Sequence, residues 1–193
     1  MTEVGVQRKN GHQRLKEASR RRIEDALFAL MQEKAFPQIT VSQIAAHADV
    51  ARRTFYRLYQ NKEDVICQYL RRICMEYQQS HAVLNHYDIR RIAEEYFCFW
   101  YQYKELILLL IDSGLEGMLY DEMRHASLEV VGNRIASEDL KDFQNLDCFA
   151  DYSAGGFINL LRRWALDGMQ GSPEQYAEKV SEAILSVIYD ERI

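Results

Sequence analysis

Apolar residues recur every three or four positions through most of this chain, which is the spacing of helices that bury one face. The first such helix is predicted from Arg20 to the residue before Pro37, because a proline pushes the preceding residue out of helical geometry. Its apolar face is made of Ile23, Ala26, Leu27, Leu30 and Met31. Residues 1–17 are polar and basic without such a period, and we expect them to form a mobile arm.

Two short helices joined by a tight turn are predicted next. Thr40 and Gln43 have the spacing of a capping box, in which each side chain accepts a hydrogen bond from the other residue's backbone N–H. After a turn at Asp49, a third helix from about Ala51 to Leu58 is expected to direct Phe55 and Leu58 inward. A supporting helix followed by two short ones is the arrangement of a helix-turn-helix DNA-binding module.

The rest of the chain also has helical spacing. Asn61 is expected to cap a fourth helix whose apolar face is Ile66, Tyr69, Leu70, Ile73 and Tyr77. The run Leu106–Ile111 is apolar on every side and is expected to be buried on every side. Other helices are predicted from about Asp88, from about Leu115 toward Val131, over Leu146–Leu166 and over Pro173–Tyr189. The predicted fold is all-α.

Glycine, proline and cysteine narrow the possible functions. No glycine lies between Gly11 and Gly114, so hairpin-rich folds and phosphate-binding glycine loops are hard to place. The four cysteines show no C-x-x-C spacing, which favours reduced, buried thiols over a zinc site or a disulfide framework. Because no nucleophile–base pairing, no metal-ligand spacing and no cofactor-binding loop is visible, we expect no enzyme activity, no metal and no cofactor.

The chain of 193 residues has an ordinary globular composition, with 48% hydrophobic and 27% charged residues. Its longest apolar run is too short to cross a bilayer, and its first thirty residues have no apolar signal core. These features predict a cytoplasmic protein that does not associate with membranes.

The net charge of −5 is unevenly distributed. Residues 1–62 contain twelve Lys or Arg and six Asp or Glu, which gives +6, whereas the remaining residues contain twelve and twenty-three, which gives −11. A basic front end joined to an acidic remainder is expected where only one end meets a polyanion.

The stretch ITVSQIAAHADVARRTFYRLYQNKED, residues 39–64, resembles the DNA-binding signature of TetR-family transcriptional regulators. The most specific parts are Thr-Phe-Tyr at 54–56, Tyr59, and Lys-Glu-Asp at 62–64. A second stretch, GFINLLRRWALDGMQGSPEQYA at residues 156–177, resembles the C-terminal domain of TetR-like regulators of Firmicutes. Together they imply a helix-turn-helix domain followed by a helical effector-binding and dimerisation domain.

Two positions depart from the family pattern. Asp49 stands in the turn where the family usually has glycine, and Asp tolerates left-handed backbone better than most residues. Ala51 replaces the serine or threonine that often caps the third helix, and such a loss typically costs ~1 kcal/mol. Neither change removes a group expected to face DNA.

The third helix is expected to enter the major groove with its exposed face. Arg52 and Arg53 lie at its start, and each is expected either to pair with guanine O6 and N7 or to contact a phosphate. Thr54 is expected to touch a thymine methyl group or a phosphate. Arg57 and the basic arm are expected to add attraction without sequence preference.

Four further residues are expected to contact the DNA backbone. Tyr56 and Tyr59 resemble the aromatic residues whose hydroxyls donate to phosphate oxygens in the family, although a packed Tyr59 is an alternative. Thr40 and Lys62 begin helices, where free N–H groups and the helix dipole favour an anion, and Lys62 adds a positive charge.

One short helix contacts only a few base pairs, so the protein is expected to bind a near-palindromic double-stranded operator as a homodimer. In TetR-like regulators the last two helices pair with their symmetry mates. Here the residues that this likeness assigns to the dimer interface are Leu160, Leu161, Trp164, Val180, Ile184 and Val187. An internal core is the alternative for these apolar stripes, and part of each belongs to it.

TetR-like regulators commonly respond to a small molecule in the C-terminal domain. The side chains that could line an effector pocket are Phe97, Trp100, Tyr101, Tyr120, Met123 and Phe157. At helical spacing the same residues could be plain core.

The sequence therefore predicts a basic arm at 1–17, a helix-turn-helix domain at 18–66 and a helical effector and dimerisation domain at 67–193. The expected function is a dimeric repressor released from its operator by a small-molecule effector. The alternative is a DNA-binding regulator, either a repressor or an activator, whose C-terminal domain responds to a protein partner.

Overall fold

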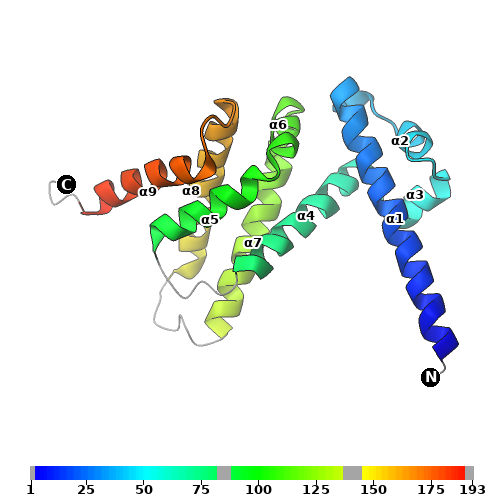
Figure 1. Ribbon diagram of the computed structural model, residues 1–193, viewed down its shortest axis with the longest axis horizontal. Coiled ribbons are helices and arrows are strands. Elements are labelled where there is room, and N and C mark those ends of the chain that lie inside the picture. Colours follow the sequence, from blue (N-terminus) through cyan, green and yellow to red (C-terminus); the bar gives the residue numbers. More distant parts are fainter. Residues whose placement is uncertain (1–2, 82–87, 137–144, 190–193) are drawn as a thin grey trace. The chain divides into compact units, whose positions relative to one another are not determined.

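Helices make up the architecture of this protein, as the apolar spacing predicted. The computed structural model describes residues 3–81, 88–136 and 145–189, and no strand occurs in these ranges (Figure 1). The chain divides into two compact units, Met1–Leu70 and Arg71–Ile193. Their boundary lies inside one continuous helix, a few residues after the predicted boundary at 66.

The first unit contains three helices, a short 3₁₀ turn and the beginning of a fourth helix. Their bounds are α1 Glu3–Glu33, the 3₁₀ turn Phe36–Gln38, α2 Val41–His47, α3 Arg52–Leu58 and α4 Lys62–His81. Helix α1 packs against both α2 and α3, which also contact each other. The apolar face predicted for α1 is confirmed, because Ile23 and Leu27 are fully buried and the other three residues are nearly so.

Helix α1 begins at Glu3, so the expected start near Arg20 is wrong. Residues 13–18 are all exposed, including Leu15 with 68% of its surface accessible. This segment is helical without burying an apolar face, since Gln, Arg, Lys and Glu are good helix formers. Because residues 13–18 have no apolar period, the sequence pattern gave no sign of this part of the helix.

Helix α2 starts with the predicted capping box. The backbone N–H of Thr40 donates to the Gln43 side-chain oxygen at 2.9 Å, and the Gln43 N–H donates to the Thr40 hydroxyl oxygen at 3.3 Å. Two of the unsatisfied N–H groups at the start of the helix are thereby paired.

The turn between α2 and α3 depends on left-handed backbone at Asp49, which has φ +50°. The N–H of Val50 returns to the carbonyl of Ala45 at 3.0 Å and closes the end of α2. Arg22 of α1 donates to the Asp49 carbonyl at 3.3 Å and so ties the turn to the first helix. Ala51, as expected, makes no side-chain cap for α3.

The second unit contains the end of α4 and five further helices: α5 Ile89–Tyr101, α6 Lys104–Asp112, α7 Glu116–Ala136, α8 Leu146–Leu166 and α9 Pro173–Tyr189. Helix α5 lies along α9, and α7 lies along α8 (Figure 1). The bounds predicted for the last two helices are confirmed. Ser172 caps α9 by accepting from the Gln175 N–H at 3.3 Å.

Aromatic side chains fill the space between α5, α8 and α9. The ring of Tyr176 stacks on Trp164 with centroids 4.8 Å apart and meets Phe97 edge-on at 4.9 Å. The Trp164 indole N–H donates to the Gln170 carbonyl at 3.0 Å, so this buried aromatic residue has its polar group satisfied. These contacts fix α9 to α5 and α8.

The expectation that Leu106–Ile111 is buried on every side is wrong. Only Ile107 and Leu110 are buried, and the other four residues are half-buried. Helix α6 packs against α7 and α8 on one side, which leaves its remaining surface partly accessible. Gly114, with φ +67°, ends the helix in a left-handed turn.

No helix in the described part of the chain combines the length and the apolar composition needed to span a bilayer.

The left-handed turn at Asp49 gives the first prediction. We expect Asp49→Ala to lower the free energy of unfolding by about 1 kcal/mol, because alanine pays the full steric cost of positive φ. Urea unfolding followed by circular dichroism measures the change. Asp49→Gly also removes the carboxylate but adopts positive φ freely, and it should stay within about 0.5 kcal/mol of the wild type. An equal loss in both variants would assign the effect to the lost ion pair between the Arg22 guanidinium and the Asp49 carboxylate, whose closest atoms are 3.8 Å apart.

Candidate functional site

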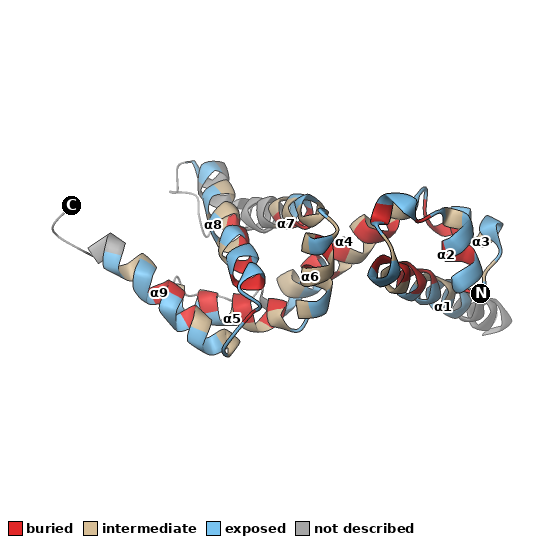
Figure 2. Ribbon diagram, turned by 90° about the horizontal axis from the view of Figure 1, so that it is seen from above, coloured by how far each residue is buried: buried red, intermediate tan, exposed pale blue. Residues whose placement is uncertain are grey.

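Helix α3 exposes one face that carries three arginines and a tyrosine. Phe55 is fully buried and Leu58 nearly so, which confirms their predicted place in the core. Since these two residues are three positions apart, they hold one side of α3 inward and turn the opposite side outward. The outward residues are Arg52, Arg53, Tyr56 and Arg57, all of them exposed. Figure 2 shows exposed positions along α3.

This outward face is positively charged. Helix α3 has the sequence RRTFYRL and contains no acidic residue. Within the described ranges, none of its three arginines forms an ion pair. Their guanidinium groups therefore keep the donors that pair with guanine edges or with phosphates.

Tyr56 stands on the same face with 53% of its surface exposed. Its ring meets Phe55 at 5.6 Å in an edge-to-face contact, which positions it by a fully buried neighbour. Thr54 is half-buried, and Thr40 at the start of α2 is exposed. The structure thus brings six of the eight predicted DNA contacts onto accessible parts of α2 and α3.

Tyr59 lies elsewhere, and the expected phosphate contact from its hydroxyl is contradicted. The residue is only 2% exposed, and its hydroxyl donates to the carboxylate of Glu24, which is 3% exposed. The guanidinium of Arg20 lies over the ring, 5.9 Å from its centroid. Tyr59 therefore joins the end of α3 to α1.

Lys62 is also used inside the unit. Its ammonium donates to the carbonyls of Phe36 at 2.6 Å, Ile39 at 2.9 Å and Pro37 at 3.3 Å. The charge also lies 4.4 Å from the centroid of the Phe36 ring. Because its three N–H donors are directed at these carbonyls, Lys62 stabilises the segment between α1 and α2, which differs from the expected phosphate contact.

Aromatic packing occupies most of the side chains that were expected to line an effector pocket. Phe97, Trp100 and Met123 are buried, and Phe157 contacts Tyr96 with ring centroids 4.9 Å apart. Tyr101 stacks on Trp164 at 5.5 Å. Of the six predicted residues, Tyr120 lines the cavity described next, and the other five are not part of its wall.

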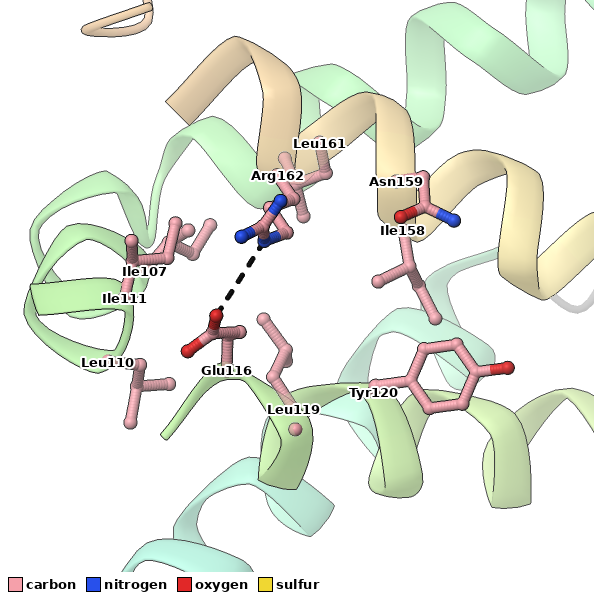
Figure 3. A pocket seen from close by; sticks show the side chains of 11 residues that line it. Ile107, Leu110, Ile111, Glu116, Leu119, Tyr120, Ile158, Asn159, Leu161 and Arg162 are labelled. Atoms are coloured by element: carbon pink, nitrogen blue, oxygen red, sulfur yellow. Dashed lines mark ion pairs between the residues drawn. The ribbon is translucent and has the colours of Figure 1, made fainter. Parts of the chain in front are cut away.

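A cavity of about 120 Å³ lies between α6, α7 and α8 (Figure 3). Its apolar wall includes Ile107, Leu110, Leu119, Ile158 and Leu161. Sequence reasoning missed this site, because aliphatic residues at helical spacing give no signal that separates a cavity wall from filled core. Glu116 and Arg162 also line it and form an ion pair of 3.6 Å between Nε and Oε1.

A separate groove of about 290 Å³ lies between α8 and α9. It is lined by three of the residues predicted for the dimer interface: Leu160, Val180 and Ile184. Leu161 and Trp164 are buried within the unit and belong to its core, which corrects their assignment to the interface. Val180 is also buried, although it lines the groove. Val187 lies in α9, but its side chain is outside the described residues.

A bidentate ion pair joins α4 to α7 in the second unit. Arg71 donates to both carboxylate oxygens of Glu122, at 3.1 Å and 3.0 Å, and Glu122 is only 8% exposed. The nearby Cys74 is buried, and burial together with the charge of Glu122 raises the pKa of its thiol to about 12. This thiol stays protonated at neutral pH and is a poor nucleophile.

In the described part of the chain, no group of three or more His, Cys, Asp or Glu residues could hold a metal ion.

The two tyrosines at the end of α3 give the second prediction. Tyr59→Phe should lower the free energy of unfolding by about 1–3 kcal/mol, because a buried carboxylate loses a hydrogen-bond donor. Tyr56→Phe, the matched control at an exposed position, should change it by less than about 0.5 kcal/mol. Urea unfolding of both variants is the measurement. Equal stability of the two would show that the contact with Glu24 carries no net free energy.

Solved structures of regulators share this fold. FadR from Bacillus halodurans, a fatty acid degradation regulator, is 15% identical with a TM-score of 0.62, and the match covers 90% of this chain and 96% of that one. FadR from Bacillus subtilis, solved in complex with stearoyl-CoA, is 16% identical with a TM-score of 0.59, covering 86% and 97%. The dihydroxyacetone kinase operon activator DhaS is 20% identical with a TM-score of 0.53, covering 88% and 96%. No curated protein matches the chain.

Two family models match the sequence. The model described as bacterial regulatory proteins of the tetR family covers residues 23–67, which contain α2 and α3. The model described as a transcriptional regulator C-terminal region covers residues 87–186, just over half of the chain. Both resemblances noted in the sequence are confirmed. The chain belongs to the TetR family of bacterial transcriptional regulators, with a DNA-binding domain followed by an effector-binding domain.

Proposed function

We propose that this regulator is a dimeric repressor that binds a near-palindromic operator and is released by a small-molecule effector. The exposed face of α3 is the observation that carries the proposal. We assign base-edge contacts to Arg52 and Arg53 and phosphate contacts to Tyr56 and Arg57, and the exposure of all four side chains supports this assignment. Buried Phe55 and Leu58 hold that face outward.

A two-fold dimer supplies the second copy of α3 that a specific operator needs. A helix of seven residues reaches only a few base pairs, so one copy gives little discrimination within a genome. The α8/α9 groove supports a self-complementary contact, because the half-buried Leu160 and Ile184 line it beside exposed Ala183. Arg163, Lys179 and Asp167 at the same groove supply a polar rim of both signs.

Release by a small molecule is supported by the cavity between α6, α7 and α8. An effector changes DNA binding only if it prefers one of two conformers of the protein. The likeness in fold to Bacillus subtilis FadR, which was solved in complex with stearoyl-CoA, adds support for a small-molecule ligand.

Activation is the alternative outcome, and the fold shared with the operon activator DhaS favours considering it. The same α3 surface would serve either outcome. Transcription in vitro from a promoter that carries the selected operator distinguishes them, because a repressor lowers transcript yield and an activator raises it.

The exposed arginines of α3 give the third prediction. We expect Arg52→Ala or Arg53→Ala to weaken operator binding by about 1–3 kcal/mol and to relax the preference at one base pair, if that side chain contacts guanine. Operators selected from a random DNA pool, followed by binding to single-base variants, measure the preference. Arg90 is an exposed arginine on α5, and Arg90→Ala is the control. It should leave the operator affinity and the base preference unchanged. If neither substitution changes the preference among single-base operator variants, the two arginines contact phosphates and not bases.

The groove between α8 and α9 gives the fourth prediction. Ile184→Asp should convert the dimer to monomers in sedimentation equilibrium, because a charge would be buried without a partner in the interface. Tyr152→Asp, on α8 with 78% of the residue exposed and outside the groove, should remain dimeric. A dimer that persists with Ile184→Asp would place the interface on another surface.

A further inference from the structure

The size of the α6/α7/α8 cavity limits the apolar part of any ligand. Its volume of about 120 Å³ is of the order of an apolar cavity known to hold benzene, roughly 150 Å³. Six of the eleven lining residues are leucine or isoleucine, so most of the wall is apolar. An apolar group of about six non-hydrogen atoms therefore fits inside it.

The polar side of the cavity holds a loose ion pair. Arg162 of α8 and Glu116 of α7 face each other across it (Figure 3). The distance of 3.6 Å between Nε and Oε1 is longer than a hydrogen bond, and both side chains are partly exposed, at 49% and 35%. An exposed pair of this kind contributes little stability, so a ligand can replace one partner at small cost.

The local structure favours replacement of Glu116 as the partner of Arg162. Glu116 is the first residue of α7, where the helix dipole and free N–H groups stabilise a negative charge without Arg162. The planar guanidinium of Arg162 can bind a carboxylate through two parallel hydrogen bonds. A ligand with an anionic group thus gains more at this rim than one with a cationic group.

We propose that the effector of this regulator is a small monocarboxylate whose apolar group of about six non-hydrogen atoms fills the α6/α7/α8 cavity and whose carboxylate pairs with Arg162. The name effector rests on the proposed function, whereas the binding site and the ligand class do not. Asn159, which also lines the cavity, donates one N–H of its side-chain amide to the Gly155 carbonyl at 2.9 Å.

Three probes with one ring and different charge test the ligand class. Benzoate, benzamide and benzylamine are titrated into the full-length protein by isothermal titration calorimetry. The proposal expects benzoate to bind at least about tenfold more tightly than benzamide, with benzylamine the weakest. Equal affinity of benzoate and benzamide, or tighter binding of benzylamine, would overturn the assignment of the carboxylate to Arg162. No binding of any probe would overturn the site itself.

A pair of arginine variants tests the residue. Arg162→Gln should remove the preference for benzoate over benzamide. The matched control is Arg124→Gln, because Arg124 also forms an ion pair between α7 and α8, with Asp151 at 2.8 Å, but does not line the cavity. The control should keep the preference. Loss of the preference in both variants would mean that the α7–α8 contact matters and that Arg162 does not bind the carboxylate.

The location is measured independently of affinity. Ile107, Ile111 and Ile158 line the cavity, so selectively labelled isoleucine methyl groups should shift in NMR spectra when benzoate binds. Ile44 in the first unit is the internal reference and should not shift. Binding without shifts at the three cavity methyls would place the ligand elsewhere and overturn the proposal. Operator binding by the ligand-free protein is measured separately, so a failure here leaves that part of the proposed function testable.

Discussion

The placement of α3 on α1 is the constraint on which the DNA-binding surface depends. A helix of seven residues is too short to be stable alone, so its orientation comes from the side chains that it buries. Phe55 and Leu58 supply the apolar contact, and Tyr59 adds a hydrogen bond to the buried carboxylate of Glu24. A polar contact of this kind is directional, and it therefore fixes the angle of α3 where apolar packing alone would allow several.

Packing in the second unit is uneven. Aromatic rings fill the space between α5, α8 and α9 at close contact distances, whereas aliphatic side chains around α6 leave a cavity. Large rigid rings pack efficiently when their edges and faces alternate, as Phe97 and Tyr176 do. The region around α6 is filled less completely and has room for a ligand. In the same region, α6 packs against α7 and α8 on one side.

The sequence was sufficient to predict the helices that bury an apolar face and the turn chemistry between them, because both depend on local spacing. The capping box at Thr40, the left-handed Asp49 and the bounds of α8 and α9 are examples. The sequence was insufficient to predict the role of a side chain whose partners are distant in the chain. Nothing near Tyr59 or Lys62 shows that Glu24 and the carbonyls at 36–39 engage them. In the same way, the partner of Arg162 is visible only once α7 lies beside α8.

The positions of the two tryptophans have a practical consequence. Trp100 and Trp164 are the whole tryptophan content of the chain, both lie in the second unit, and both are almost fully buried. Intrinsic tryptophan emission therefore follows the loosening of that unit alone. The unit that carries α3 contains no tryptophan and is silent in such a spectrum. A single emission curve would therefore describe one unit, and a far-ultraviolet signal is needed to follow the other.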